Sequence, residues 1–171
     1  MTPTSEQIES ERRGAPELLK GAAVVSGGVL VVHAAELIAS TVANFGLYTD
    51  SGGVFGLTLL SVFGEIAFAR LPFAVGILLT LWLVRPAVAR SSIQRVIGTG
   101  AIAALGGGIL LFVVQLAMQI VQAPNYSLMG RVPGVNPFYS VTFALNIAIT
   151  SFPLVILGVV LLWLYLRRRS I

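Results

Sequence analysis

Four ionisable side chains stand inside long apolar stretches of this chain. His33 and Glu36 are three residues apart in the first stretch, and Glu65 and Arg70 are five residues apart in the second. An ionised group in hydrocarbon is costly unless it is paired or hydrated, so each of the four needs a partner or a function. Carboxylates and an imidazole can exchange protons, and His33 with Glu36 could act as an acid/base pair. The chemistry open to these residues is therefore ion pairing, proton transfer or binding of a polar solute.

Neutral polar residues of two further apolar stretches fall at a similar depth. Counted from the outer helix ends at ~1.5 Å per residue, all of them lie about 10 to 18 Å deep. This polar layer consists of His33, Glu36, Glu65, Arg70, Gln115, Asn146 and Thr150. On each of the first three helices the polar residues recur at helical spacing, so they lie along one stripe. The pattern predicts a polar cavity in the outer half of a membrane protein.

Arg70 requires a partner because arginine stays charged. On an α-helix, residues 65 and 70 are about 140° apart, so Glu65 and Arg70 do not share a face. Pro72 lacks an amide proton and leaves the carbonyl of Phe68 without its helical donor. We therefore expect Arg70 to pair with Glu36 or with the Phe68 carbonyl, and both Glu36 and Arg70 to lie inside the bundle.

Three interpretations of the polar layer remain open. It can be a buried network of ion pairs and hydrogen bonds that sets helix register. It can be a hydrated, proton-titratable pathway or small-ligand site, which the prolines at mid-depth in two helices also favour. Finally, it can be the face that contacts a partner protein in the membrane.

Catalytic and metal-binding motifs are absent from the sequence. There is no HExxH, no GxSxG and no phosphate-binding loop, and the chain has one histidine and no cysteine. We therefore expect a protein that is not an enzyme, with no catalytic residue, no metal ligand and no cofactor.

Four apolar stretches must position the polar layer. They cover about 21–45, 58–84, 96–121 and 139–166, and each exceeds the ~20 residues of helix that cross a bilayer. Hydrophobic residues make up 56% of the chain and charged residues 11%, against about 25% charged residues in soluble domains. The sequence predicts an all-α, integral membrane four-helix transmembrane bundle over 21–166. A polar N-terminal arm, 1–20, precedes it, and a basic tail, 167–171, follows.

The distribution of basic residues predicts the orientation. If four spans are crossed in turn, Arg131 lies on one side, and nine basic residues lie on the other: Arg12, Arg13, Lys20, Arg85, Arg90, Arg95, Arg167, Arg168 and Arg169. The positive-inside rule then places both termini in the cytoplasm, with the chain in the plasma membrane. The net charge of +4 reflects these flanks, which suit anionic lipid head groups at the cytoplasmic face rather than nucleic acid.

Small residues at four-residue spacing predict a close helix contact. Gly100, Ala104 and Gly108 form such a row in the third stretch, and Ala35 and Ala39 form one in the first. Small residues let helix backbones approach closely in lipid. We expect these two rows to form a packing seam against each other.

Together these features predict a small, non-enzymatic multi-pass membrane protein with a polar, ionisable cavity in its outer half. An accessory subunit or a small-solute-binding protein fits best, and a proton-coupled transporter or channel acting as a homo-oligomer is the alternative. The expected partners are the lipid bilayer and either a membrane protein or further copies of this chain.

Overall fold

A computed structural model describes residues 5–45, 54–84, 91–127 and 136–169, almost all of them helical. The elements are α1 (Ser5–Phe45), α2 (Val54–Glu65), η1 (Ile66–Arg70), α3 (Leu71–Leu79), η2 (Thr80–Val84), α4 (Ile93–Ser127) and α5 (Pro137–Arg169). Four helical segments are long and apolar enough to cross a membrane: Leu18–Ala43, Leu60–Val84, Ile93–Gln122 and Pro137–Arg168. They coincide closely with the four stretches predicted from hydropathy.

The first helix extends beyond its apolar stretch. α1 begins at Ser5 and continues through Pro16, so the described part of the polar arm belongs to the same helix as the first span. Proline in a helix interior removes one backbone hydrogen bond. Here that loss does not end the helix.

The second candidate span belongs to one continuous helix whose hydrogen bonding changes twice along its length. α2, η1, α3 and η2 follow one another without a break, and η1 and η2 are π-helical. The amide of Leu71 donates to the carbonyl of Ile66, five residues earlier. Pro72 follows at once, so the wide turn of η1 stands where a proline was expected to disturb the helix.

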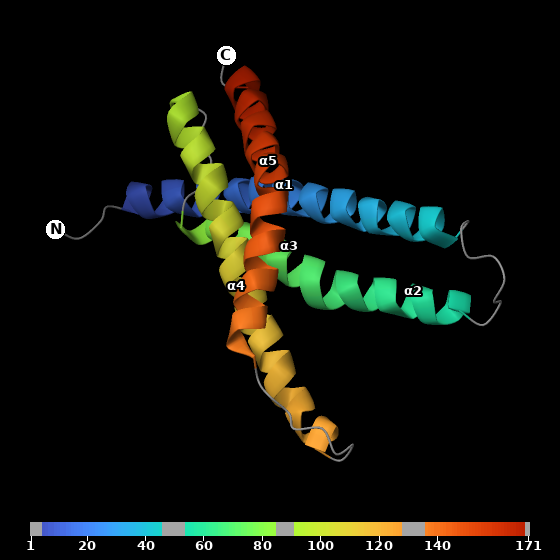
Figure 1. The fold of residues 1–171 in the computed structure, drawn as a ribbon. Coiled ribbons are helices and arrows are strands. Elements are labelled where there is room, and N and C mark those ends of the chain that lie inside the picture. Colours follow the sequence, from blue (N-terminus) through green and yellow to red (C-terminus); the bar gives the residue numbers. More distant parts are fainter. Residues whose placement is uncertain (1–4, 46–53, 85–90, 128–135, 170–171) are drawn as a thin grey trace.

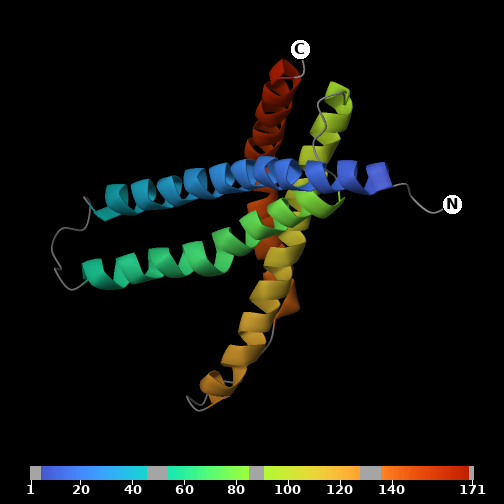
Figure 2. The same ribbon diagram turned by 180° about the vertical axis from the view of Figure 1, so that it is seen from behind.

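The helices form two hairpins that cross. α1 pairs with the α2–α3 helix and α4 pairs with α5, and Figures 1 and 2 show the two pairs crossing, with α3 at the crossing, and diverging on either side. Close to the crossing, a buried apolar core draws on all four spans, with Val25, Phe73, Leu111 and Val155 among its members. The chain is thus all-helical, but its hairpins cross instead of lying side by side.

Glycines bring α3 and α4 together at this crossing. A Cβ atom on Gly76 would lie 2.7 Å from both the carbonyl oxygen of Gly106 and the Cα of Gly107. Such a distance to backbone atoms leaves no room for a side chain. The ring of Phe73 also covers Gly107, where a Cβ would lie 2.8 Å from it.

The predicted glycine seam lies at a helix contact, but its expected partner is wrong. A Cβ on Gly100 would lie 3.0 Å from the Cα of Ile156, and one on Gly108 would lie 3.2 Å from the Cβ of Ala148. Both neighbours belong to α5, the sequential neighbour of α4. The two alanines expected to face the seam, Ala35 and Ala39, are exposed on α1. The arrangement of the hairpins is the physical reason: α5 packs on α4 within one hairpin, and the crossing brings α3, rather than α1, against α4.

Candidate functional site

A polar cavity of about 330 Å³ lies between the two hairpins. Its lining comes from α1, the α2–η1 junction and α5, and consists of His33, Glu36, Glu65, Arg70, Phe143, Asn146, Ile147 and Thr150. Six of these eight residues belong to the polar layer predicted from the sequence. The cavity therefore collects residues that are more than 100 positions apart in the chain.

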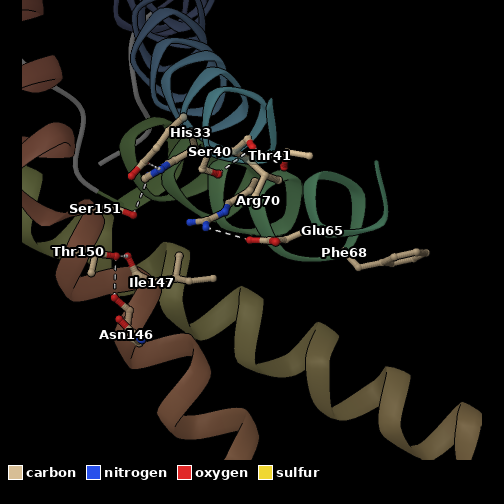
Figure 3. Close-up of polar contacts among 12 residues, drawn as sticks. His33, Ser40, Thr41, Glu65, Phe68, Arg70, Asn146, Ile147, Thr150 and Ser151 are labelled. Carbon is tan, nitrogen blue, oxygen red and sulfur yellow. Dashed lines mark hydrogen bonds and ion pairs between the residues drawn. The ribbon is translucent and has the colours of Figure 1, made fainter. Parts of the chain in front are cut away.

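Arg70 pairs with Glu65, which corrects the partner expected from the sequence. The Nη2 of Arg70 donates to the Oε1 of Glu65 over 3.0 Å, as Figure 3 shows. The expectation assumed an α-helix, in which these residues point in different directions. The segment between them is π-helical, and its hydrogen bonds join residues five apart, so positions i and i+5 come onto one face.

The Phe68 carbonyl finds a different donor. The side-chain Nε2 of Gln115 on α4 donates to it over 3.0 Å. A glutamine from the next helix thus supplies the donor that Pro72 cannot. Gln115 is the one predicted member of the polar layer that does not line the cavity, and it acts instead as a tie between the spans.

His33 is held from two sides. It is only 6% exposed, and its Nε2 lies 2.8 Å from the Oγ of Ser151 on α5. Its Nδ1 lies 3.5 Å from the Oε2 of Glu36, which is long for a hydrogen bond. A carboxylate can only accept, so the consistent tautomer carries its proton on Nδ1 and accepts the Ser151 hydroxyl proton at Nε2.

The two charged groups expected inside the bundle differ in burial. The Arg70 side chain is 18% exposed and lies within the fold, although its Nε is buried with no hydrogen-bond partner among the described residues. The Glu36 side chain is 74% exposed, so its expected burial is wrong. Glu36 stands at the mouth of the cavity because the diverging hairpins leave that face of α1 uncovered.

Asn146 and Thr150 form the opposite wall, on α5. Both are exposed and lie one helical turn apart. The Thr150 hydroxyl donates to the carbonyls of Asn146 and Ile147 on its own helix, at 2.8 and 3.2 Å. Its proton is thereby engaged, and its lone pairs remain for a donor in the cavity.

Two functional contacts escaped the sequence prediction of the site. Ser151 was not expected to contact His33, because nothing in either stretch signals a pairing between the first and last spans. Gln119 lies on the same stripe as Gln115, and it joins α4 to α5. Its Nε2 donates to the Ser140 hydroxyl over 2.7 Å, and its Oε1 accepts from the Asn136 amide over 2.8 Å.

Glu36, His33 and Ser151 stand in the order carboxylate, imidazole and hydroxyl. In hydrolases that order activates a serine nucleophile. Here the serine is fully buried at 0% exposure and is absent from the cavity lining, so its hydroxyl orients the imidazole. Within the described residues, no group of three or more His, Cys, Asp or Glu side chains is placed to hold a metal ion. The geometry favours binding or proton exchange at Glu36 and His33.

Comparison of the chain with protein-family models, with curated proteins and with solved structures finds no match in any of the three. The assignment of a function to this helical chain therefore depends on its own cavity.

Proposed function

We propose that this chain is a small multi-pass membrane protein that binds a small polar solute in the cavity between its hairpins, in an accessory role and without catalysis. The observation that carries the proposal is the cavity itself. It brings together four ionisable residues from two candidate spans: His33, Glu36, Glu65 and Arg70. Ionisable groups at membrane depth are rare and usually mark a solute or ion site. A volume of about 330 Å³ is at the small end for ligand pockets.

Buried core residues adjoin the cavity lining on three helices: Val29 lies one turn before His33 on α1, Phe73 follows Arg70, and Val155 follows Thr150 on α5. Glu36 and Asn146, in contrast, are exposed members of the lining. A solute would enter the cavity past these two residues.

The orientation that we propose places the termini in the cytoplasm of a plasma-membrane protein. The basic end of α5 suits that interface, since the guanidinium of Arg167 lies 5.4 Å from the ring centroid of Trp163. Aromatic and basic residues are typical of the junction between hydrocarbon and head groups. In this orientation the cavity mouth faces the outside of the cell.

Cysteine labelling tests whether the cavity holds water. The chain contains no cysteine, so a single Asn146→Cys or Thr150→Cys change introduces the only thiol. We expect a charged, membrane-impermeant methanethiosulfonate added to intact cells to modify both positions rapidly, because a hydrated thiol ionises and a thiol in lipid does not.

Leu145→Cys provides the matched control. Leu145 is adjacent to Asn146 on α5 and is 49% exposed, but it does not line the cavity. We expect its modification to be at least roughly tenfold slower, since a thiol in hydrocarbon ionises little. Equal rates at Leu145 and Asn146 would show that no polar cavity distinguishes the two faces.

A proton-coupled transporter or channel formed by a homo-oligomer is the second candidate. The row from Glu36 through His33 to Ser151 favours it, because it aligns titratable and hydroxyl groups from the cavity mouth on α1 to a buried position on α5. The tightly packed glycine contact between α3 and α4 would have to open for transport.

The mass of the complex isolated in mild detergent separates the two candidates. A complex with a different membrane protein supports the accessory role. A complex of several copies of this chain supports transport, because four helices seldom enclose a pathway alone.

A further inference from the structure

We infer that the cavity takes a small organic cation, an ammonium group on an apolar body, with the carboxylate of Glu36 as its counter-ion. This inference rests on the proposed solute-binding function and adds the chemical class of the solute. It follows from the charge balance of the cavity, the hydrogen-bonding capacity of its walls and the position of its apolar lining residues.

The charges that line the cavity leave one carboxylate without a full partner. Glu65 and Arg70 neutralise each other through their 3.0 Å ion pair. Within the described part of the chain, the nearest group of opposite charge to Glu36 is His33, 3.5 Å away and charged only when protonated. With a neutral imidazole the lining carries one uncompensated negative charge, so a cation is the ligand that would balance it.

Glu36 is also the accessible acid. Its side chain is 74% exposed at the cavity mouth, whereas that of Glu65 is 39% exposed and engaged by Arg70. The buried Nδ1 of His33 has no hydrogen-bond partner within the described residues and faces the Glu36 carboxylate. The Glu36 carboxylate is therefore the acid in the lining that a ligand can reach.

Several hydrogen-bond acceptors lie in the cavity wall together with the Glu36 carboxylate. Thr150 directs its hydroxyl proton to its own helix and presents lone pairs. Glu36 contributes two carboxylate oxygens, and the Asn146 amide offers its oxygen as an acceptor and its NH2 group as a donor. Arg70 donates from Nη2 to Glu65, and its Nε is buried. Three N–H donors of an ammonium group suit this arrangement, whereas a carboxylate or phosphate would meet like charge.

Two apolar residues complete the lining. Phe143 and Ile147 lie one turn apart on α5, and the Phe143 ring stacks on Tyr139 with a centroid separation of 6.1 Å. Aromatic rings attract cations through their electron-rich faces, and both residues can cover an apolar ligand body. The lining therefore fits an amine with a short aromatic or aliphatic substituent better than a fully hydrated inorganic ion.

Thermal unfolding of the full chain in mild detergent tests the inference with three probes of one shape: benzylammonium, benzyl alcohol and benzoate. We expect benzylammonium to raise the unfolding midpoint in a saturable way, and the neutral and anionic probes to have little effect. Glu36→Gln should weaken the apparent affinity for benzylammonium by roughly tenfold to a hundredfold, as expected for loss of a charged hydrogen bond.

Two further variants serve as controls, one for charge and one for position. Glu36→Asp retains the charge and should retain most of the affinity, and Ser40→Ala, one turn along α1 and outside the cavity lining, should bind like the original chain. Unchanged affinity in Glu36→Gln, stronger binding of benzoate, or no stabilisation by benzylammonium would overturn the inference. If Asn146→Cys is still labelled rapidly in those cases, the proposed hydrated cavity stands and only the inference of an organic cation fails. Failure of the inference is therefore distinguishable from failure of the proposed function.

Discussion

Ser151 supplies the hydrogen-bond partner of the buried Nε2 of His33. The hydroxyl is fully buried, and its contact with His33 spans 118 residues of sequence. The adjacent Thr150 donates only to carbonyls of its own helix. Two neighbouring hydroxyls on α5 thus have different tasks: Ser151 joins α5 to α1, and Thr150 shapes the cavity wall.

Removing the Ser151 hydroxyl should destabilise the fold more than removing that of Thr150. Ser151→Ala leaves the buried Nε2 of His33 without a partner, and we expect a loss of about 1–3 kcal/mol in the free energy of unfolding. Thr150→Ala leaves no buried group unpaired and should change stability far less. Thermal or denaturant unfolding in detergent measures both. Equal losses would show that the Ser151–His33 bond contributes no cross-helix stability.

The π-helical segment η1 is the element that assembles the charged part of the cavity. It places Arg70 beside Glu65 and precedes Pro72, while Gln115 caps the Phe68 carbonyl. A π-turn accommodates one more residue than an α-turn over the same rise, so η1 behaves as a single-residue insertion within an α-helix. The faces that α2 and α3 present depend on this extra residue.

Deleting Ala67, an exposed residue of η1, should therefore be tolerated. The segment can return to α-helical hydrogen bonding, and Arg70 then follows Glu65 by four residues, which still places the two on one face. Deletion of Ala74, in the α-helical segment α3, provides the control, because it rotates the flanking faces by about 100°. We expect the first variant to retain a cooperative unfolding transition and the second to lose it. A severe loss of stability on deleting Ala67 would contradict this account of η1.

The crossing of the two hairpins sets the shape of the whole molecule (Figures 1 and 2). The backbones of α3 and α4 touch at Gly76, Gly106 and Gly107, and the hairpins diverge from there to expose Glu36 and Asn146. The close glycine contact at the crossing and the open cavity beside it therefore both result from the way the hairpins cross. Loss of the glycine contact should disturb the cavity as well as the core.

Gly76→Ala should be strongly destabilising, by about 1–3 kcal/mol or more, because its methyl group would overlap backbone atoms of α4. Gly64→Ala is the matched control within the same span, since no atom lies within 4 Å of its added Cβ. An alanine there should be neutral or stabilise the helix by about 0.5–1 kcal/mol. Unfolding midpoints of the two variants in detergent provide the comparison, and an unaffected Gly76→Ala would exclude the close crossing.

The orientation of the whole chain is a prediction from charge, and its test sites Asp50, Arg90 and Arg131 lie outside the described residues. We expect Asp50→Cys and Arg131→Cys to react with an impermeant thiol reagent in intact cells, and Arg90→Cys to react only after the cells are opened. The cysteine-free background excludes competing thiols. Labelling of Arg90→Cys from outside would reverse the assignment.

The sequence alone determined the helical class, the four long apolar segments and the residues of a polar layer, because hydropathy, helical period and residue type are local properties. It could not determine which of those residues would meet. The pairing of Arg70 with Glu65 required a π-turn, whose hydrogen bonding the residue pattern does not reveal. The exposure of Glu36 and the contact of Ser151 with His33 follow from the crossing of the hairpins, and the packing of Gly108 on α5 follows from the pairing of α4 with α5. Only the tertiary structure decided these contacts, because the distance between two segments in space does not follow from their separation in the sequence.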